Sequence, residues 1–599
     1  MRRPVPCLPV LAALLLCATA ATPQDAPAEW QTRAELSGFR ATPSYDETLA
    51  FLRRLEARSP QMRLLFYGTS AEGRPLPVVV VSREQAFTAA EARRLAKPIV
   101  LVVNGIHAGE IDGKDACLMI LRDLALGRRA ELQDAATLLI VPIYNVDGHE
   151  RVSPYNRPNQ DGPVEGMGFR TTTSGLDLNR DHMKLQSPEA RALVGLFNEW
   201  RPHLHVDDHV SDGFDHAWVL GYGIAEAPQA AAPVDAWFKT HLPAVVSATT
   251  QAGSGIGPYV SLRDDADLGA GFVSGPYSPR FSTIYFNLRN RPSILIETHS
   301  YKPYRERVLG NRNFLLALLG EIGKDPASLR AAVDEAEAAE VARGRAGAPP
   351  SEIALTYDVG EADSLRFPVY AWRNETSVVT GQPFQRQRHG EAGPPDFPWQ
   401  HRPRVAKSVP RPRGYLVPPG WPQIEQALKA HGLQVSRLDE PAEIEVETSR
   451  LSSPRFAAQT YQGLRPVASV EVTRRMETRR FPAGTSWIPA DQPDFEVAAQ
   501  LLEPEAPDSL LSWGMLSSVF ESKEYIDLPI LEDLAREMLK DPKVAAEWES
   551  ALKDETFAKD AQARQAWWYR RTPYWDETVG LLPVFRVMTR PALRTTTWP

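Results

Sequence analysis

The sequence predicts an α/β protein built around a largely parallel sheet with helices on both faces. Two observations lead to this prediction: short apolar runs rich in β-branched residues alternate with amphipathic stretches, and each run is apolar at nearly every position. Strands of that kind are typical of parallel sheets buried between two layers of helices. A chain of 599 residues with 43% hydrophobic residues is also long enough for two or more domains.

The first half of the chain supplies the elements of this sheet. Helices are predicted where apolar residues recur every three or four positions, and one begins with Ser187 as N-cap followed by Pro188. Helices are expected at residues 44–57, 112–127 and 187–200. Strands are expected at residues 76–81, 98–103, 137–144, 203–208 and 293–298.

The composition changes near residue 325. An alanine-rich helix is expected at 327–345, whereas residues 381–422 are rich in Pro, Arg and Gly, which predicts a loop or linker. Beyond it, the patterns predict a short helix at 423–431, antiparallel strands within 443–482 and helices within 531–563.

We therefore expect five segments in the chain. They are a signal peptide at 1–20, a lead-in at 21–43, a catalytic α/β domain at 44–325, a helical and Pro-rich linker region at 326–422, and a smaller α+β accessory domain at 423–599.

The N-terminus has the features of a cleavable signal peptide. Arg2 and Arg3 precede an apolar run at 10–18, and Ala18-Thr19-Ala20 offers small residues for cleavage. The run is too short for a membrane anchor, so we expect a secreted or periplasmic protein. Cleavage would leave Cys117 as the single cysteine, which excludes an internal disulfide and is expected to be a buried thiol.

The charge of the chain argues against nucleic acid as a partner. The formal net charge is −8, and no long run of Lys or Arg occurs. Serine hydrolysis through a nucleophile elbow is also disfavoured, because no Gly-x-Ser-x-Gly motif is present. The sequence leaves the oligomeric state open.

A histidine and a glutamate follow the strand expected at 98–103. His107 and Glu110 are three residues apart, so an imidazole nitrogen and a carboxylate oxygen can reach one zinc ion. One such pair is expected by chance among 12 histidines and 75 acidic residues, but this pair lies in a turn after a strand. Ligands of α/β sheets bind at that end of the strands, so the pair is a candidate metal site.

The next histidines offer a third ligand. His203, His205 and His209 share one face of a strand, but His205 and His209 are about 13 Å apart along it and cannot bind one ion. We choose His209 because it lies at the carboxyl end. His203 and His205 are expected to be hydrogen-bonded histidines in or near the core.

Glu297 lies at the end of the apolar run at 293–298. An unpaired buried carboxylate is costly, so Glu297 either pairs with Arg289 or Arg291 or has a chemical role. Beside a metal-bound water it could take a proton as general base and return that proton to a leaving amine.

A polar stretch between these elements contains Asp177, Asn179 and Arg180. Arginine beside asparagine suits recognition of a carboxylate, because the guanidinium fork pairs with both oxygens. Asp177 could accept the spare N–H of a ligating histidine. Alternatively, the acids of this loop pair with Arg180. Arg170 is a further cation in a polar stretch.

These motifs, in this order and with Asn145-Val-Asp147-Gly148 between them, resemble the M14 (carboxypeptidase A-like) family of zinc carboxypeptidases, of the exported bacterial type with a C-terminal extension. The resemblance covers about residues 40–325. It implies a mixed sheet of about eight strands, one zinc ion per chain, and hydrolysis of the C-terminal peptide bond of peptides or proteins.

The resemblance also implies a role for each residue. Zinc would be bound by His107, Glu110 and His209, with Asp177 supporting His107. Glu297 would be the general base for the zinc-bound water. The remaining residues would contact the substrate: Arg170 at the oxyanion, Asn179 and Arg180 at the terminal carboxylate, and Tyr277 or Tyr285 as a mobile tyrosine.

The chain departs from the digestive members of that family at Gly109, where they have an arginine that serves outer substrate subsites. Two other functions stay open: a zinc amidase or endopeptidase acting on cell-wall (peptidoglycan) peptides, and a non-catalytic binding protein on the same scaffold. The side-chain preference is not predicted, although Arg280 and Arg289 are candidates for recognising an acidic terminal residue.

Overall fold

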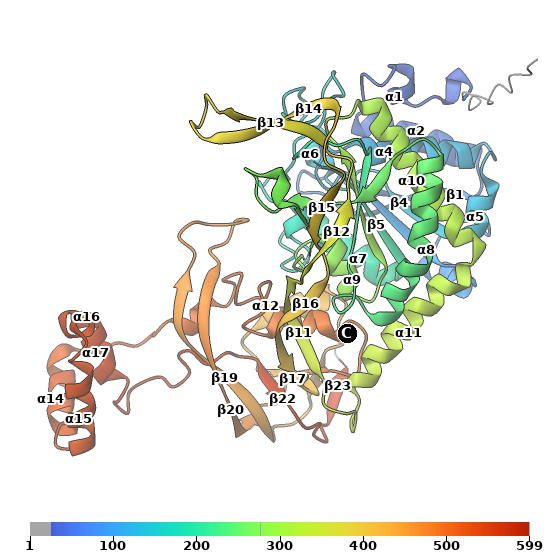
Figure 1. Cartoon of the computed structure of the whole chain (residues 1–599). Coiled ribbons are helices and arrows are strands. Elements are labelled where there is room, and N and C mark those ends of the chain that lie inside the picture. Colours follow the sequence, from blue (N-terminus) through green and yellow to red (C-terminus); the bar gives the residue numbers. More distant parts are fainter. Residues whose placement is uncertain (1–25, 212, 276, 598–599) are drawn as a thin grey trace, which may run out of the picture.

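An eight-stranded sheet forms the centre of the N-terminal half of the computed structural model, which describes residues 26–211, 213–275 and 277–597 (Figure 1). The strand order is β1-β2-β4-β3-β5-β10-β6-β7. The strands β4, β3, β5 and β10 run parallel, whereas β1, β2 and β6 join through antiparallel pairs. The predicted mixed, largely parallel sheet is confirmed; the signal peptide expected at 1–20 lies outside the described residues. The eight strands are β1 (Met62–Thr69), β2 (Pro75–Val81), β3 (Ile99–Asn104), β4 (Thr137–Val141), β5 (Leu204–Ser211), β6 (Leu220–Ile224), β7 (Ile256–Pro258) and β10 (Ser293–His299).

Helices cover both faces of this sheet. The alternation of side chains along β3 shows the division: Leu101 points into one core and Val102 into the other. The first core is covered by α3 (Ala89–Arg94), α7 (Pro188–Trp200) and α9 (Ser282–Leu288). The second core is covered by α2 (Tyr45–Arg58), α4 (Asp112–Ala125), α5 (Ala130–Ala135), α8 (Ala232–Gln251), α10 (Tyr304–Lys324) and α11 (Pro326–Gly344).

The predicted helices begin where their capping residues indicate. Ser44 and Glu47 form a reciprocal capping box at the start of α2, and Ser187 accepts the N–H of Ala190 at the start of α7. Cys117 is buried on α4, as expected for an inert thiol. Short helical segments complete this half: η1 (Ala28–Trp30), α1 (Arg33–Leu36), α6 (Val146–His149), η2 (Leu178–Arg180) and η3 (Leu268–Ala270).

The loop prediction for residues 381–422 is wrong, because most of this segment forms strands. Several of its prolines lie at the ends of strands, where the missing N–H is tolerated: Pro383 begins β14, and Pro403 and Pro410 bound β16. The strands of this part are β8 (Ser261–Leu262), β9 (Phe272–Val273), β11 (Glu352–Val359), β12 (Ala362–Arg366), β13 (Tyr370–Thr376), β14 (Pro383–Ala392), β15 (Asp396–Gln400) and β16 (Pro403–Pro410). The strand β15 pairs with β9, so this segment extends the N-terminal half of the structure.

A second, seven-stranded sheet lies in the C-terminal region, in the order β20-β19-β22-β17-β21-β18-β23. The antiparallel strands expected within 443–482 are the long pair β19 and β20. The strands are β17 (Gly414–Val417), β18 (Ser436–Leu438), β19 (Ala442–Phe456), β20 (Val467–Phe481), β21 (Ser486–Pro489), β22 (Phe585–Val587) and β23 (Thr595–Thr597). The helices beside this sheet are α12 (Pro422–Ala430), α13 (Phe495–Leu502) and η4 (Ser517–Phe520).

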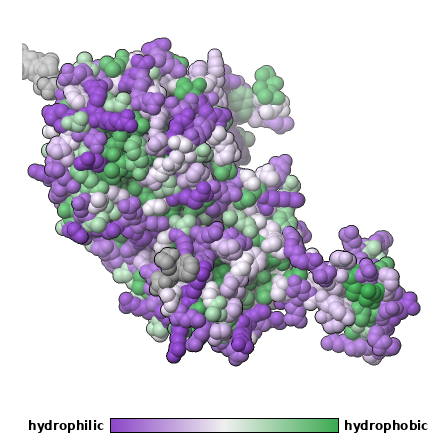
Figure 2. Space-filling model, turned by 180° about the vertical axis from the view of Figure 1, so that it is seen from behind, coloured by the Kyte–Doolittle hydropathy of each residue, from purple (hydrophilic) through white to green (hydrophobic). Residues whose placement is uncertain are grey.

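Four short helices near the C-terminus form a separate body that projects from the molecule (Figure 1). Trp568 and Tyr569 are buried in its small core, and apolar residues also gather on its surface (Figure 2). No helix within the described residues is long and apolar enough to span a membrane. The four helices are α14 (Leu528–Met538), α15 (Pro542–Ala551), α16 (Glu555–Lys559) and α17 (Ala561–Tyr569).

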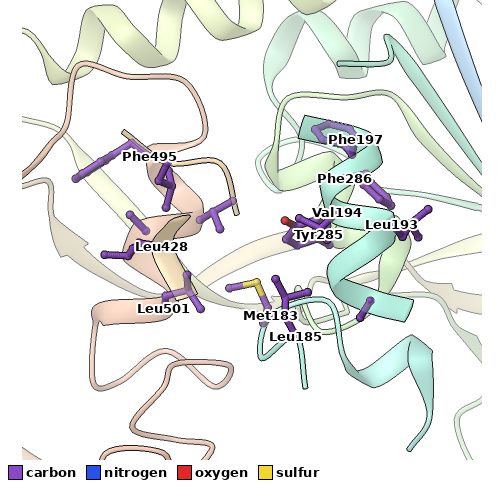
Figure 3. Packing of buried hydrophobic residues seen from close by; sticks show 14 of the residues in the cluster. Met183, Leu185, Leu193, Val194, Phe197, Tyr285, Phe286, Leu428, Phe495 and Leu501 are labelled. Carbon is purple, nitrogen blue, oxygen red and sulfur yellow. The ribbon is translucent and has the colours of Figure 1, made fainter. Parts of the chain in front are cut away.

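The C-terminal region shares a hydrophobic core with the catalytic half. Figure 3 shows Phe197 and Tyr285, from α7 and α9, facing Leu428 and Phe495, from α12 and α13. Because apolar side chains from both parts are buried together, separating them would expose a large apolar area. The domain boundaries stay predictions, but the two parts are packed as one body here.

Buried ion pairs cross the same contact. Asp494, at the start of α13, accepts hydrogen bonds from Arg289 at 2.8 Å and from Arg201 at 2.5 Å. Burial alone would raise the pKa of the Asp494 carboxyl, but the two guanidinium charges outweigh burial and hold the pKa well below its usual value.

We predict that Asp494→Asn lowers the free energy of unfolding at pH 7 by about 3–5 kcal/mol, because it leaves the buried Arg289 guanidinium without its counter-charge and removes one of the two carboxylates paired with Arg201. Since the folded pKa of Asp494 is depressed, its stabilisation is present above the unfolded pKa of 3.8 and is lost as the pH falls below it. Urea unfolding at pH 7 and pH 3 should therefore show a smaller difference between wild type and variant at pH 3.

The control is Asp491→Asn, which removes a part-exposed pair with Arg590 and should cost at most about 1 kcal/mol. Equal effects of the two substitutions, or a difference for Asp494→Asn that does not change with pH, would contradict this account.

Candidate metal centre and substrate cavity

The carboxyl ends of three neighbouring parallel strands meet at one edge of the sheet. His107 and Glu110 lie in the turn between β3 and α4, His209 lies near the end of β5, and Glu297 lies on β10. Glu297 is directly opposite His209 in the strand register. The strand order therefore brings together four residues that are up to 190 positions apart in the chain.

His107, Glu110 and His209 form a compact triad. Nδ1 of His107 is 3.0 Å from Oε1 of Glu110, and Nδ1 of His209 is 3.0 Å from Oε2 of the same carboxylate. All three side chains are buried, and one ligand atom from each lies within 4.8 Å of the other two. Two imidazole nitrogens and one carboxylate are a donor set of catalytic zinc sites, so these residues fit the expected ion.

Each histidine of the triad is held by a second carboxylate. Nε2 of His107 is 3.1 Å from Oδ1 of Asp177, as expected for a supporting residue. Nε2 of His209 is 2.9 Å from Oδ2 of Asp207, which the sequence analysis did not single out. Asp207 lies two residues before His209 on the same strand face, so this spacing was the signal that could have identified it.

The two carboxylates stay ionised despite their burial. Burial would raise the pKa of Asp207, but His209 outweighs it and lowers the pKa to about 2. Burial likewise opposes ionisation of Asp177, and His107 with Arg170 brings its pKa well below the usual value. Carboxylates in this state can accept the Nε2–H of each ring, which would leave Nδ1 as the nitrogen that could bind an ion.

The two other histidines of this segment are hydrogen-bonded, as expected: His205 is buried in the core, and His203, just before β5, is partly buried. His205 is buried with Nδ1 2.8 Å from the Ser293 hydroxyl, and Nδ1 of His203 accepts the backbone N–H of Ile99. Neither imidazole contacts the triad through a hydrogen bond within the described ranges.

Arg157 contacts the triad and was missed from the sequence. Its Nη2 is 2.9 Å from Oε1 of Glu110, and it lies in an irregular Pro-rich loop where no pattern indicates its position. The same loop explains Gly109: a Cβ there would lie 2.7 Å from the carbonyl oxygen of Gly168 and 2.9 Å from Arg157. The space beside position 109 is thus filled by Arg157 and the backbone.

The Asn145-Val-Asp147-Gly148 motif positions Arg170. Nδ2 of Asn145 donates to the carbonyl of Arg170, and a Cβ on Gly148 would lie 2.7 Å from the carbonyls of Phe169 and Thr171. Only glycine permits this close approach. The Arg170 side chain then pairs with Asp177 at 3.0 Å and lines the cavity described below.

Glu297 is buried but does not pair with the arginines suggested for it. Arg289 pairs with Asp494, and Arg291 pairs with Glu337 at 2.6 Å. Burial raises the pKa of the Glu297 carboxyl to about 8, and repulsion from Glu110 contributes. Glu297 therefore does not form the structural ion pair with Arg289 or Arg291 that the sequence left open.

A cavity of about 910 Å³ opens in front of these residues. Eight residues proposed from the sequence line it together: His107, Glu110, Arg170, Asn179, Arg180, His209, Tyr277 and Glu297. Asp177 lies behind His107. Tyr285 is not brought to the cavity, because its buried hydroxyl lies 2.7 Å from Nδ1 of His431 in the shared core.

An apolar part of the cavity lining comes from α8, α9 and neighbouring strands, and the charged residues Glu226, Asp235 and Lys239 also line the cavity. The apolar residues of the cavity include Ile224, Phe238, Leu242, Val246, Ile284 and Leu295. Arg280 and Arg289, considered for recognising an acidic residue, do not line it: Arg280 pairs with Asp508 at 2.7 Å and Arg289 with Asp494.

Comparisons with known proteins agree with this geometry. Residues 48–212 match the model of the zinc carboxypeptidase family (peptidase M14), a segment that contains the metal triad but not Glu297. Carboxypeptidase 2 of Trichophyton rubrum is 23% identical over 504 residues, which cover 79% of this chain and 84% of that protein. Carboxypeptidase 2 of Trichophyton equinum is 24% identical over 506 residues, with the same coverage. Since these relatives are fungal, a bacterial origin stays a prediction.

Solved structures give weaker similarity. A metallo-carboxypeptidase from Burkholderia cenocepacia has a TM-score of 0.36 and 18% identity, covering 47% of this chain and 70% of that one. Carboxypeptidase A from Helicoverpa armigera has a TM-score of 0.36 and 17% identity, covering 48% and 74%. Both TM-scores are low, so the fold assignment depends on the sheet topology. The family match and the curated relatives support a zinc carboxypeptidase enzyme.

We predict that Asp207→Asn weakens zinc binding about 10–100-fold, because the amide no longer fixes the His209 ring as a carboxylate does. Competition with a chromophoric chelator measures the affinity. Asp235→Asn, on a carboxylate that pairs with Lys239 on α8, is the matched control and should bind zinc as wild type does. Unchanged affinity in Asp207→Asn would show that Asp207 does not support the metal site.

Proposed function

We propose that the protein is an exported zinc carboxypeptidase that removes the C-terminal residue of peptides or proteins. The single observation that carries the proposal is that Glu297, the metal triad and Arg180 line the same cavity. An ion site, a buried carboxylate and a fixed cation in one cavity are what hydrolysis next to a terminal carboxylate requires. Export is inferred from the signal-peptide features of residues 1–20.

Glu297 is suited to the proton transfers of the reaction. Zinc, when bound, supplies Lewis acidity that polarises a carbonyl and makes water more acidic. Glu297 would accept the proton of the attacking water and deliver it to the nitrogen of the leaving residue. Burial raises the pKa of this carboxyl, which helps it hold the proton between the two steps, while the positive charge of a bound zinc ion would favour the ionised form that first accepts the proton.

The substrate would be oriented by polar groups that line the cavity near the triad. Arg180 and Asn179 would bind the terminal carboxylate, and Arg170 would stabilise negative charge on the carbonyl oxygen during attack. Arg170 suits that role because Asp177 holds it through Nε and Nη2 while it lines the cavity. Tyr277 lines the cavity as well, so it is the tyrosine that we place at the substrate.

The apolar part of the cavity lining points to the terminal side chain that the cavity accepts. Phe238, Leu242 and Ile284 would bury an aliphatic or aromatic side chain, with a gain of about 1.5–3 kcal/mol for a fully buried one. A charged side chain packed against these three residues would lose hydration without gaining a partner from them. We therefore infer a preference for apolar C-terminal residues.

We predict that the mature, zinc-loaded protein releases single C-terminal residues from a mixed peptide library and that a zinc chelator abolishes the release. Mass spectrometry of the products should show peptides ending in Leu or Phe shortened faster than those ending in Asp or Lys. Cell-wall stem peptides are included in the mixture. Cleavage confined to them would replace the proposal with a cell-wall amidase, and no cleavage would favour a binding protein.

We predict that Glu297→Gln lowers kcat by at least about 100-fold while the protein keeps one zinc per chain, because the amide cannot accept the proton. Zinc content is measured by mass spectrometry of the metal, and turnover on a peptide found in the library screen. Glu306→Gln, on an exposed residue of α10, is the control and should keep full activity. Full activity of Glu297→Gln would contradict the proposed mechanism.

A further inference from the structure

A hairpin of the C-terminal region reaches the predicted carboxylate-binding residues. The tip, residues 457–466, joins β19 and β20 and closes with two backbone hydrogen bonds between Tyr461 and Leu464. Gln462 and Gly463, between them, have φ values of 51° and 76°. Positive φ at both central residues is typical of the tight turns that close hairpins, so the tip presents Tyr461 and Gln462 in a defined conformation.

Both residues at the turn contact the site. Nε of Arg180 donates a hydrogen bond to the Tyr461 hydroxyl oxygen at 3.2 Å. The side-chain oxygen of Gln462 accepts the backbone N–H of Asp177 at 2.9 Å. The tip thus contacts both ends of the segment that contains Asp177, Asn179 and Arg180, although it lies about 280 residues farther along the chain.

The Arg180 guanidinium is fixed on three sides. Nε is bound by Tyr461, Nη1 donates to the carbonyl of Asn179 at 2.9 Å, and the guanidinium lies 4.2 Å from the centre of the Phe281 ring. Nη2 makes no hydrogen bond to any residue in the described ranges. A guanidinium held in this way keeps one N–H edge for an anion and loses little side-chain entropy on binding it.

Tyr461 is itself held from behind. Its ring stacks on Trp513, with ring centres 6.0 Å apart and an angle of 5° between the planes. Trp513 is buried, and the guanidinium of Arg280 lies 5.0 Å from its ring centre while Arg280 pairs with Asp508. Aromatic stacking and the ion pair therefore anchor the tip against the catalytic half.

We propose that the hairpin tip completes the carboxylate-binding site, with Tyr461 as a positioning residue for Arg180; this rests on the proposed carboxypeptidase function. Because the Tyr461 oxygen accepts the Nε–H of Arg180, its own hydrogen is available to a second acceptor. The substrate carboxylate beside Arg180 is an acceptor of the right charge. The C-terminal region would thereby contribute directly to recognition of a free C-terminus.

The substitution Tyr461→Phe tests this proposal because it keeps the ring that stacks on Trp513 and removes only the hydroxyl. For a peptide with a free C-terminus we expect KM to rise about tenfold, with kcat changed less than about twofold, as for loss of one hydrogen bond to a charged group. For the same peptide with a C-terminal amide, KM should change little. The melting temperature should stay that of wild type.

The control is Tyr574→Phe, on an exposed tyrosine of the same region that lies outside the site. Its KM for both peptides should equal that of wild type. The proposal would be overturned if Tyr461→Phe raised KM equally for the free acid and the amide, or raised it for neither. A purely structural contact would not distinguish a C-terminal carboxylate from a C-terminal amide.

Calorimetric binding of a free-acid tripeptide keeps this test separate from catalysis. If wild type cleaves nothing but Tyr461→Phe binds the tripeptide about tenfold more weakly, the proposed function fails and the role of the tip stands. If wild type cleaves peptides and both proteins bind the tripeptide equally, the proposed function stands and the role of the tip fails.

Discussion

The shared carboxylate of Glu110 is the interaction on which the site depends. Each of its oxygens lies 3.0 Å from an imidazole nitrogen, one from the β3–α4 turn and one from β5. Nitrogens and oxygens this close, buried and backed by two further carboxylates, form a ready-made site for a cation. The strand order, the glycines behind Arg170 and the supporting carboxylates all serve to hold this arrangement.

Several residues outside the cavity serve to position the side chains that line it. Asn145 and Gly148 act on the backbone of Arg170, and Asp207 acts on His209. None of these three needs to contact a substrate for the site to depend on it. Residues of this kind make the precise placement of the lining groups possible, which matters because small displacements of reacting groups reduce rates strongly.

The C-terminal region is part of the same structural unit as the site. It shares a core with α7 and α9, joins it through the buried Asp494 ion pairs, and contacts Arg180 through Tyr461. The similarity to the fungal carboxypeptidases covers 79% of the chain, so it extends beyond the catalytic domain expected at 44–325. These observations fit a region that is packed together with the catalytic domain and contacts a residue of the cavity, rather than an independently placed domain.

The sequence by itself predicted five of the eight strands of the central sheet, the helices α2, α4, α7 and α11 beside it, and the residues of the candidate metal triad. It could do so because strand-end motifs such as His107-x-x-Glu110 depend on local order and on the parallel pairing that apolar strands favour. The long helices α8 and α10 were not predicted. The sequence also indicated Asp177, Asn179, Arg180 and Glu297. Only the tertiary structure decided which tyrosine lines the cavity, and it alone revealed Arg157, whose loop has no periodic pattern.

The contact between Tyr461 and Arg180 and the strands within 381–422 were equally beyond local patterns. A composition rich in proline and glycine predicts a loop unless strand pairing places each proline where no N–H is needed, and such pairing is a property of distant partners. Arg180 and Tyr461 are 281 positions apart and meet only in the folded chain, so no local sequence pattern could predict their contact.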